Sequence, residues 1–262
     1  MWALPFGRKK RNYMTRLFIA ILISVCCFSA AHAQIVDVEQ SEKFNTDSVL
    51  RDFDDRPFFG IYKDNYFVGG TSIGTKPTSH NSDVKFQVSI SQRLTRSVLP
   101  FNTYAFLFYS QKCMWNVFEK SLPMRDFNFN PGLGFTKLLI SKNRLVGKLT
   151  LMIEHESNGR DKMYDRSWNK LSFAGNIYLT PNVMIHGKYW LTYIDSKQNK
   201  DILRYNGIYQ TGIQVLSPNQ RWVFSATFVK RKGWNLNGNT IVDIGWRIRK
   251  KDNQFLMLHY YN

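Results

Sequence analysis

Cysteine is scarce in this sequence: only Cys26, Cys27 and Cys113 occur among 262 residues. The first two lie in an N-terminal segment with the features of an export signal, so cleavage would leave a single cysteine. One thiol forms no intramolecular disulfide and cannot build a cysteine-based zinc site. A small disulfide scaffold and a zinc-cysteine fold are therefore excluded.

Long hydrophobic runs are also missing. The N-terminal apolar stretch, "LFIAILISVCCFSA" at residues 17–30, is too short to cross a bilayer comfortably as a helix. It follows a basic segment, "RKKRNYMTR", and precedes "AHA", a small-residue cleavage pattern before Gln34. We therefore predict that residues 1–33 are a cleaved signal peptide. The polar, acidic residues 34–56 are expected to form a mobile lead-in to the folded part.

Acidic residues are few, with 19 Asp and Glu against 36 Lys and Arg, giving a net charge of +17. The predicted signal peptide holds five of the basic residues and no acidic one, so the mature chain would carry about +12. In an exported protein, anionic lipid headgroups are a better counter-charge for such a chain than nucleic acid. Solvated surface lysines remain the alternative.

Helical periodicity of useful length is absent from the rest of the chain. Instead, short segments alternate apolar and polar residues, carry many aromatics and are separated by Gly, Asn, Pro, Lys or Asp turns, a pattern typical of β-strands. The expected strands are 65–73, 84–92, 101–111, 133–140, 145–157, 167–178, 182–193, 204–216, 220–230, 239–249 and 254–261.

A soluble sandwich and a transmembrane barrel both fit many such strands. The strand lengths match the roughly 9 to 11 tilted residues that cross a bilayer. Aromatics, 15% of the chain, crowd the strand ends as interfacial girdles do. Most connections are brief, whereas 112–132, 158–166 and 194–203 are expected to be longer loops. We therefore predict that residues 57–262 form an all-β, antiparallel transmembrane β-barrel.

The expected strand 145–157 has two different faces, because successive side chains of a strand point to opposite sides. Its odd positions, from Leu145 to Ile153, are apolar and should meet lipid. The even positions include Lys148, Glu154 and Glu156 and should line a polar lumen. His155 and Ser157 end the odd series, so they are expected on the lipid face near the membrane's edge.

The strand at 167–178 brings a third polar residue to the same face. Antiparallel pairing about a loop centred near residue 162 places Asn169 roughly opposite His155, with Ser157 one pleat repeat further on. A hydroxyl, an imidazole and an amide can act as nucleophile, base and orienting group. A neutral amide also costs less beside hydrocarbon than a carboxylate. The alternative is an ordinary polar girdle where the strands meet the headgroups.

The full string "HESNGRDKMYDRSWN" (155–169) resembles the signature of the outer-membrane phospholipase A family. In that family a histidine, a serine two residues later, an S-N-G-R turn and the asparagine of R-S-W-N form the site, and both spacings are kept here. "YSQKCMW", "SLPMRDFNFNP", "DVKFQVSIS" and "RPFFGIYKDNYFVGG" look like further pieces of the family. The resemblance runs from about residue 56 nearly to the end of the chain.

The resemblance implies a catalytic triad with Ser157 as nucleophile, His155 as base and Asn169 as orienting residue. The reaction implied is hydrolysis of the acyl esters of glycerophospholipids, a phospholipase A1 and A2 activity in the bacterial outer membrane. The backbone N–H of Gly159 would help to stabilise the oxyanion. A G-x-S-x-G elbow, typical of soluble esterases, is absent from the sequence.

The resemblance also implies a calcium ion and a homodimer. Arg160, through its backbone carbonyl, and Asp165 occupy the family's calcium-loop positions, and Ser121 resembles the ligand that the partner subunit lends. Asp165 replaces the family's usual hydroxyl residue, which a hard cation should tolerate. Gln111 matches a glutamine of the dimer contact, unless it is an ordinary interfacial polar residue.

Two alternatives remain open from sequence. A non-enzymatic barrel, serving as a pore, adhesin, scaffold or inactive relative, would share the strands without the activity.

The last segment, "NQFLMLHYYN", resembles the start of the family's penultimate strand, after which the family continues with one more strand. We expect about eleven strands of a twelve-stranded family fold, with the C-terminal strand missing, unless the chain closes another way, for instance with ten strands.

Overall fold

The computed structural model describes residues 46–161, 164–194, 199–249 and 252–262. The predicted signal peptide lies outside these residues. The structure is dominated by one antiparallel sheet of twelve strands. The strands are β1 (Phe59–Gly60), β2 (Tyr66–Thr71), β3 (Ser82–Arg93), β4 (Thr103–Trp115), β5 (Met124–Ser141), β6 (Arg144–Ser157), β7 (Ser167–Thr180), β8 (Val183–Tyr193), β9 (Tyr209–Leu216), β10 (Trp222–Lys230), β11 (Gly238–Arg247) and β12 (Phe255–Tyr261).

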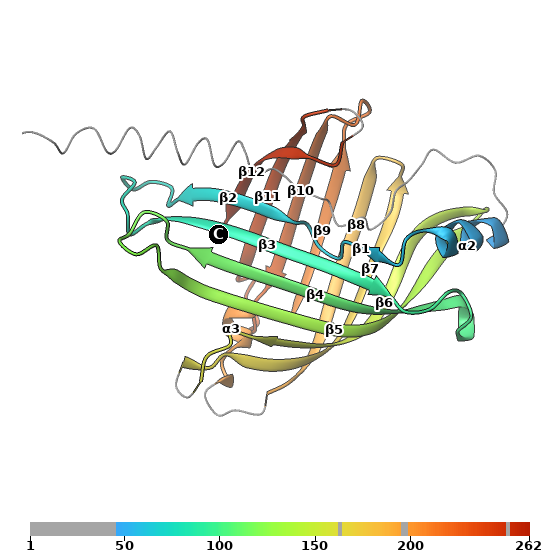
Figure 1. The fold of residues 1–262 in the computed structure, drawn as a ribbon, viewed down its shortest axis with the longest axis horizontal. Helices are drawn as coiled ribbons and strands as arrows, with labels where there is room; N and C mark the ends of the chain where they lie inside the picture. The colour runs from blue at the N-terminus through green and yellow to red at the C-terminus, as the bar shows by residue number, and fades with distance from the viewer. Residues whose placement is uncertain (1–45, 162–163, 195–198, 250–251) are drawn as a thin grey trace, which may run out of the picture.

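The sheet follows chain order from β3 to β12, and each strand pairs with the next. Strands β1 and β2 both pair with β3, so they share one position at its edge. The sheet curls around an interior, with β3 to β5 crossing in front of β8 to β11 (Figure 1). These features confirm the predicted all-β, antiparallel architecture.

The first and last strands approach each other through side chains. Among the described residues, backbone pairing does not join β12 to β1 or β2. Inside the sheet, however, Nζ of Lys85 on β3 lies 3.1 Å from Nε2 of His259 on β12. The ring of His259 also stacks on Tyr66 of β2. The interior polar groups of the two edges therefore meet.

Helix α2 (Thr46–Asp55) forms in the second half of the segment 34–56, which we expected to be a mobile lead-in, and residues 34–45 lie outside the described residues. The ring of Phe53, in this helix, packs edge-on against the ring of Tyr104. The buried guanidinium of Arg93 donates to the carbonyls of Phe53, Asp54 and Arg56, which lie at the helix C-terminus. These are groups that a helix leaves unsatisfied. A tertiary contact from β3 thus stabilises a helix whose apolar stripe is too short to recognise.

Within the described ranges, two shorter helices lie in the connections. They are the 3₁₀ turn η1 (Pro100–Asn102) and α3 (Leu203–Asn206). The strand expected at 204–216 begins only at Tyr209, because helix α3 occupies its first residues. Gly207, with φ of +82°, ends that helix. No helix within the described ranges is long and apolar enough to span a membrane.

Strand β5 is far longer than the expected 133–140, and the predicted loop 112–132 is wrong. Strand β4 continues to Trp115 and β5 begins at Met124. The alternation of residues simply continues through Pro131: Asn130 is buried, whereas Pro131 and Leu133 are exposed. A proline that sequence reading takes as a strand breaker therefore lies inside a central strand.

The two ends of the sheet differ. We call the loop end the side where β2–β3, β4–β5, β6–β7, β8–β9 and β10–β11 are joined, and the turn end the opposite side. The turn end holds tight connections such as residues 142–143 between β5 and β6, and α2 lies there. Helix α3 lies at the loop end, away from α2 (Figure 1).

Candidate active site at the loop end of strands β6 and β7

Strand β6 has an apolar outer face and a polar inner face, as predicted. On the outer face Leu151 is 45% exposed and Ile153 is 65% exposed. On the inner face Glu154 is only 2% exposed. Burial of ionic groups inside an apolar outer surface is the pattern of a barrel that faces lipid. His155 continues the exposed series.

The predicted pairing of β6 with β7 is confirmed. His155 lies opposite Asn169, and the two side chains are hydrogen bonded, with Nδ1 of His155 2.9 Å from Oδ1 of Asn169. An amide oxygen only accepts, so Nδ1 carries the proton. The other ring nitrogen, Nε2, is therefore the basic one.

Ser157 is the last residue of β6 and lies two residues beyond His155, on the same face. It pairs with Ser167 at the start of β7. Among the described contacts, no hydrogen bond joins the Ser157 hydroxyl to the imidazole. The structure thus brings His155 and Asn169 into contact and leaves Ser157 as their neighbour at the strand end.

The loop after Ser157 is organised by a residue that sequence reading treated only as part of a turn. Asn158 is buried, and its Oδ1 accepts from the backbone N–H groups of Arg160 and Arg166. Its Nδ2 donates to the carbonyl of Tyr164. One asparagine side chain therefore ties both ends of the loop together, a use of Asn that turns favour. The Asn-Gly pair in the sequence was the available signal.

Gly159 has φ of +66°, a conformation that costs glycine little and other residues more. A Cβ built at this position would lie 3.0 Å from the ring of Phe129 on β5. Position 159 therefore favours glycine for both reasons.

Arg160 and Asp165 line the same depression of about 460 Å³ at the loop end. Oδ2 of Asp165 accepts a hydrogen bond of 3.3 Å from Asn199, and the Arg160 side chain donates to the carbonyl of Arg125 on β5. Arg166 forms an ion pair with Asp126 in the same depression. Within the described residues, no group of three His, Cys, Asp or Glu side chains could hold a metal ion.

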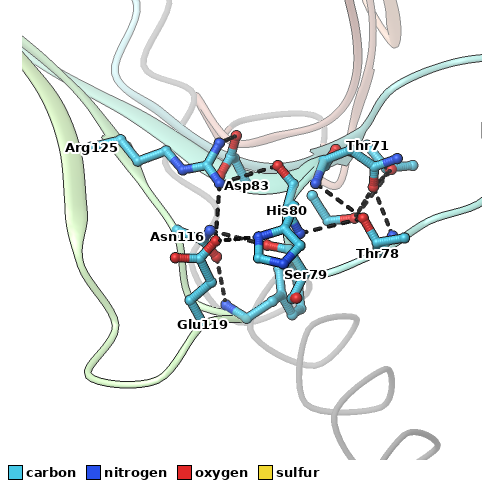
Figure 2. Close-up of polar contacts among 11 residues, drawn as sticks. Thr71, Thr78, Ser79, His80, Asp83, Asn116, Glu119 and Arg125 are labelled. Carbon is cyan, nitrogen blue, oxygen red and sulfur yellow. Dashed lines mark hydrogen bonds and ion pairs between the residues drawn. The ribbon is translucent and has the colours of Figure 1, made fainter.

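Ser121 lies outside this depression, in the connection between β4 and β5, where its φ is +65°. That connection is held by a cluster of polar side chains around Arg125 (Figure 2). Arg125 contacts Asp83 of β3 and Glu119 of the connection, each at 3.3 Å, and donates to the carbonyl of His80. The Arg125 carbonyl also accepts from Arg160. Arg125 therefore links the β2–β3, β4–β5 and β6–β7 loops.

The carboxylate of Glu119 contacts two side chains, those of His80 and Arg125. Nδ1 of His80 lies 2.9 Å from its Oε1, and Arg125 contacts the same oxygen. The hydrogen bond from His80, followed by the charge of Arg125, lowers the pKa of Glu119 below its ordinary value. The loop cluster is therefore ionic at neutral pH.

Gln111 lies on β4, opposite Val88, which is 49% exposed. Its Oε1 accepts from the hydroxyl of Tyr109 at 2.9 Å, and its Nε2 contacts the sulfur of Cys113 at 3.4 Å. Gln111 thus belongs to the outer face, and it is in register with Phe129 of β5, which in turn pairs with Ser157.

Beneath the outer pair, the inner face carries an ionic network that the sequence alone did not assemble. Glu154 lies 2.6 Å from Nζ of Lys188 and accepts from the hydroxyl of Ser172. Glu156 pairs with Lys170. The strands that present His155 and Asn169 outward are therefore also joined by charge-assisted contacts inward.

The chain matches the family model described as Phospholipase A1 over residues 59–262, which is most of its length. The chain belongs to the phospholipase A1 family. Phospholipase A1 of Proteus vulgaris is 32% identical over 151 residues, covering 54% of this chain and 50% of the relative. That of Klebsiella pneumoniae is 26% identical over 213 residues, covering 74% of each. The match therefore spans half the length of the first relative.

Solved structures of the phospholipase A1 family share the fold. Outer membrane phospholipase A of Escherichia coli aligns with a TM-score of 0.62 at 24% identity, over 73% of this chain and 80% of that one. The Salmonella typhi outer membrane phospholipase dimer with bound calcium aligns with a TM-score of 0.64 at 23% identity, over 80% and 86%. At these identities the likeness establishes the fold alone.

Proposed function

We propose that the chain is a phospholipase of the bacterial outer membrane that hydrolyses acyl esters of glycerophospholipids. The observation that carries the proposal is the hydrogen bond between His155 and Asn169 on the lipid-exposed face, beside Ser157. An ester carbonyl of a phospholipid lies at the headgroup boundary. An outward-facing site near the ends of two spanning strands meets the ester there.

In the proposed reaction Ser157 attacks the ester carbonyl while Nε2 of His155 takes its proton. The carbon–oxygen bond to the glycerol breaks, and the imidazolium returns the proton to the leaving lysophospholipid. Water, activated by the same imidazole, then releases the fatty acid. Asn169 holds the ring in the tautomer that leaves Nε2 basic.

The oxyanion of this reaction requires a donor outside the triad. The backbone N–H of Gly159 follows the nucleophile by two residues and is our candidate. The tight packing of Gly159 against Phe129 supports a fixed position for this peptide.

The loop also suits calcium. Calcium takes oxygen ligands, and Arg160 and Asp165 line one depression. We propose that the Arg160 carbonyl and the Asp165 carboxylate supply two of these ligands. When bound, the ion would supply positive charge near the oxyanion. Two protein oxygens are few for calcium, so we propose that Ser121 of a second copy completes the set in a homodimer. Gln111, on the outer face of β4, is our candidate for a polar contact between the copies.

The proposal is tested by incubating the full chain with a synthetic glycerophospholipid in detergent micelles and measuring fatty acid release. Release that depends on added calcium supports the proposal. If no fatty acid appears while the folded protein conducts ions across liposomes, the chain is a non-enzymatic barrel and the proposal is wrong.

A further inference from the structure

The ladder between β5 and β6 is interrupted beside the proposed base. Pairs run from Ser141↔Arg144 to Gly132↔Glu154 and resume at Phe129↔Ser157. The register is the same on both sides of the gap. Pro131 therefore lies opposite His155, at the one point where a pairing partner lacks a backbone N–H.

The carbonyl of His155 points toward this proline. In a strand, carbonyls of alternate residues point to the same neighbour. The carbonyl oxygens of Ile153 and Leu151 lie 3.1 and 2.6 Å from the Cβ positions built on Gly132 and Gly134 of β5. The odd carbonyls of β6 thus face β5, and that of His155 would have no donor from Pro131.

Asn130 supplies the missing donor. Its Nδ2 donates to the carbonyl of His155 at 2.9 Å, and its side chain is part of a residue only 4% exposed. Its Oδ1 accepts from Nζ of Lys63 at 3.2 Å. A backbone carbonyl can only accept, so the amide presents its NH₂ to His155 and its oxygen to Lys63.

We propose that Asn130 is a positioning residue for the general base, replacing the main-chain hydrogen bond that Pro131 cannot make. The inference rests on the proposed function. His155 is then held at two points: Asn169 on β7 holds the ring, and Asn130 on β5 holds the main chain. Without Asn130 the backbone at His155 can shift, and small displacements of a catalytic group cost rate.

The test is the hydrolysis rate of the full chain in detergent, with kcat and KM measured separately. Asn130→Ala should lower kcat roughly 10- to 100-fold with little change in KM. Asn130→Asp should do the same while keeping its shape and its contact with Lys63, because a carboxylate cannot donate to the carbonyl. It serves as the second variant if the alanine variant folds poorly.

Rescue separates positioning from general damage. The double variant Asn130→Ala with Pro131→Ala regains a backbone N–H opposite His155, so it should recover most of the lost kcat. A matched control is Asn128→Ala. Asn128 lies on the same strand and face but donates to the side chain of Glu156, so its loss should leave kcat near wild type.

A second readout follows the nucleophile without turnover of lipid. The rate at which an organophosphonate labels Ser157 should fall in Asn130→Asp and recover when Pro131→Ala is added. Wild-type kcat in both Asn130 variants, or no recovery in the double variants, would overturn the inference. An inactive wild type would instead count against the proposed function.

Discussion

At the scale of single residues, the proposed chemistry depends on the bond between His155 and Asn169. Asn169→Ala removes the orienting oxygen but leaves the base and the nucleophile, so activity should fall without vanishing. We expect a loss of about 10- to 100-fold, the range seen when a metal-bound histidine loses its orienting partner. Fatty acid release at saturating substrate measures this loss. Activity equal to wild type would remove Asn169 from the mechanism.

The pairing of His155 with Asn169 could be derived from the sequence because strand alternation gives the face and antiparallel pairing about the loop centre near residue 162 gives the register. The roles of Asn158 and Asn130 could not be derived in this way. Asn158 acts through backbone groups up to eight residues away, and Asn130 acts across the sheet where Pro131 breaks the ladder. The local residue pattern reveals neither the loop conformation that brings these groups to Asn158 nor the strand that lies beside Asn130.

At the scale of elements, strands β6, β7 and β8 are joined inside by buried charges. Glu154→Gln would leave the ammonium of Lys188, 11% exposed, without its carboxylate. Breaking a buried pair from one side costs about 3–5 kcal/mol. Urea unfolding in detergent should show this loss.

Adding Lys188→Met to Glu154→Gln removes the stranded charge and should restore much of the stability. An unchanged unfolding midpoint in Glu154→Gln alone would contradict the buried network.

The connection between β4 and β5 should respond to acid. The pKa of Glu119 lies below its ordinary value of 4.5, so its contribution to loop anchoring is complete above that pH and is lost as the pH falls through the lowered pKa. His80, Arg125 and Asp83 are the other charged or titratable groups of the cluster. A nitroxide on Lys120→Cys should become more mobile in electron paramagnetic resonance spectra below pH 4.5.

In Glu119→Gln the same label should be mobile at neutral pH as well. If the mobility of the label changes neither with pH nor with this substitution, the cluster does not anchor the loop.

The elements that sequence reading missed share a cause. The periodicity of the strands predicted most of the sheet, including both faces of β6. Helix α2 and the first half of β5 were missed because each is stabilised by partners distant in sequence. These partners are Arg93 for the helix, and β4 together with the His155 carbonyl of β6 for the strand. The local sequence of α2 is polar and that of β5 contains Pro131, and both features are typical of loops.

At the scale of the whole molecule, calcium and a second copy should promote each other's binding. An ion held by oxygens from two copies binds the dimer better than the monomer. Sedimentation in detergent should show tighter dimerisation with calcium than with chelator.

Asp165→Ala should abolish the calcium effect, whereas Asp161→Ala, a change in the same loop at a residue with no assigned role, should retain it. Equal dimerisation with calcium and with chelator, or full activity from a cross-link-verified monomer, would refute the shared site.

The measurement that tests the central claim most directly compares fatty acid release by wild type and Ser157→Ala from the same synthetic glycerophospholipid, with calcium present. Heat-modifiable migration on gels, a property of folded barrels, checks that both proteins are folded. The account predicts release by the wild type and none above background by Ser157→Ala, with identical migration. Equal release by the two folded proteins would contradict the proposed triad.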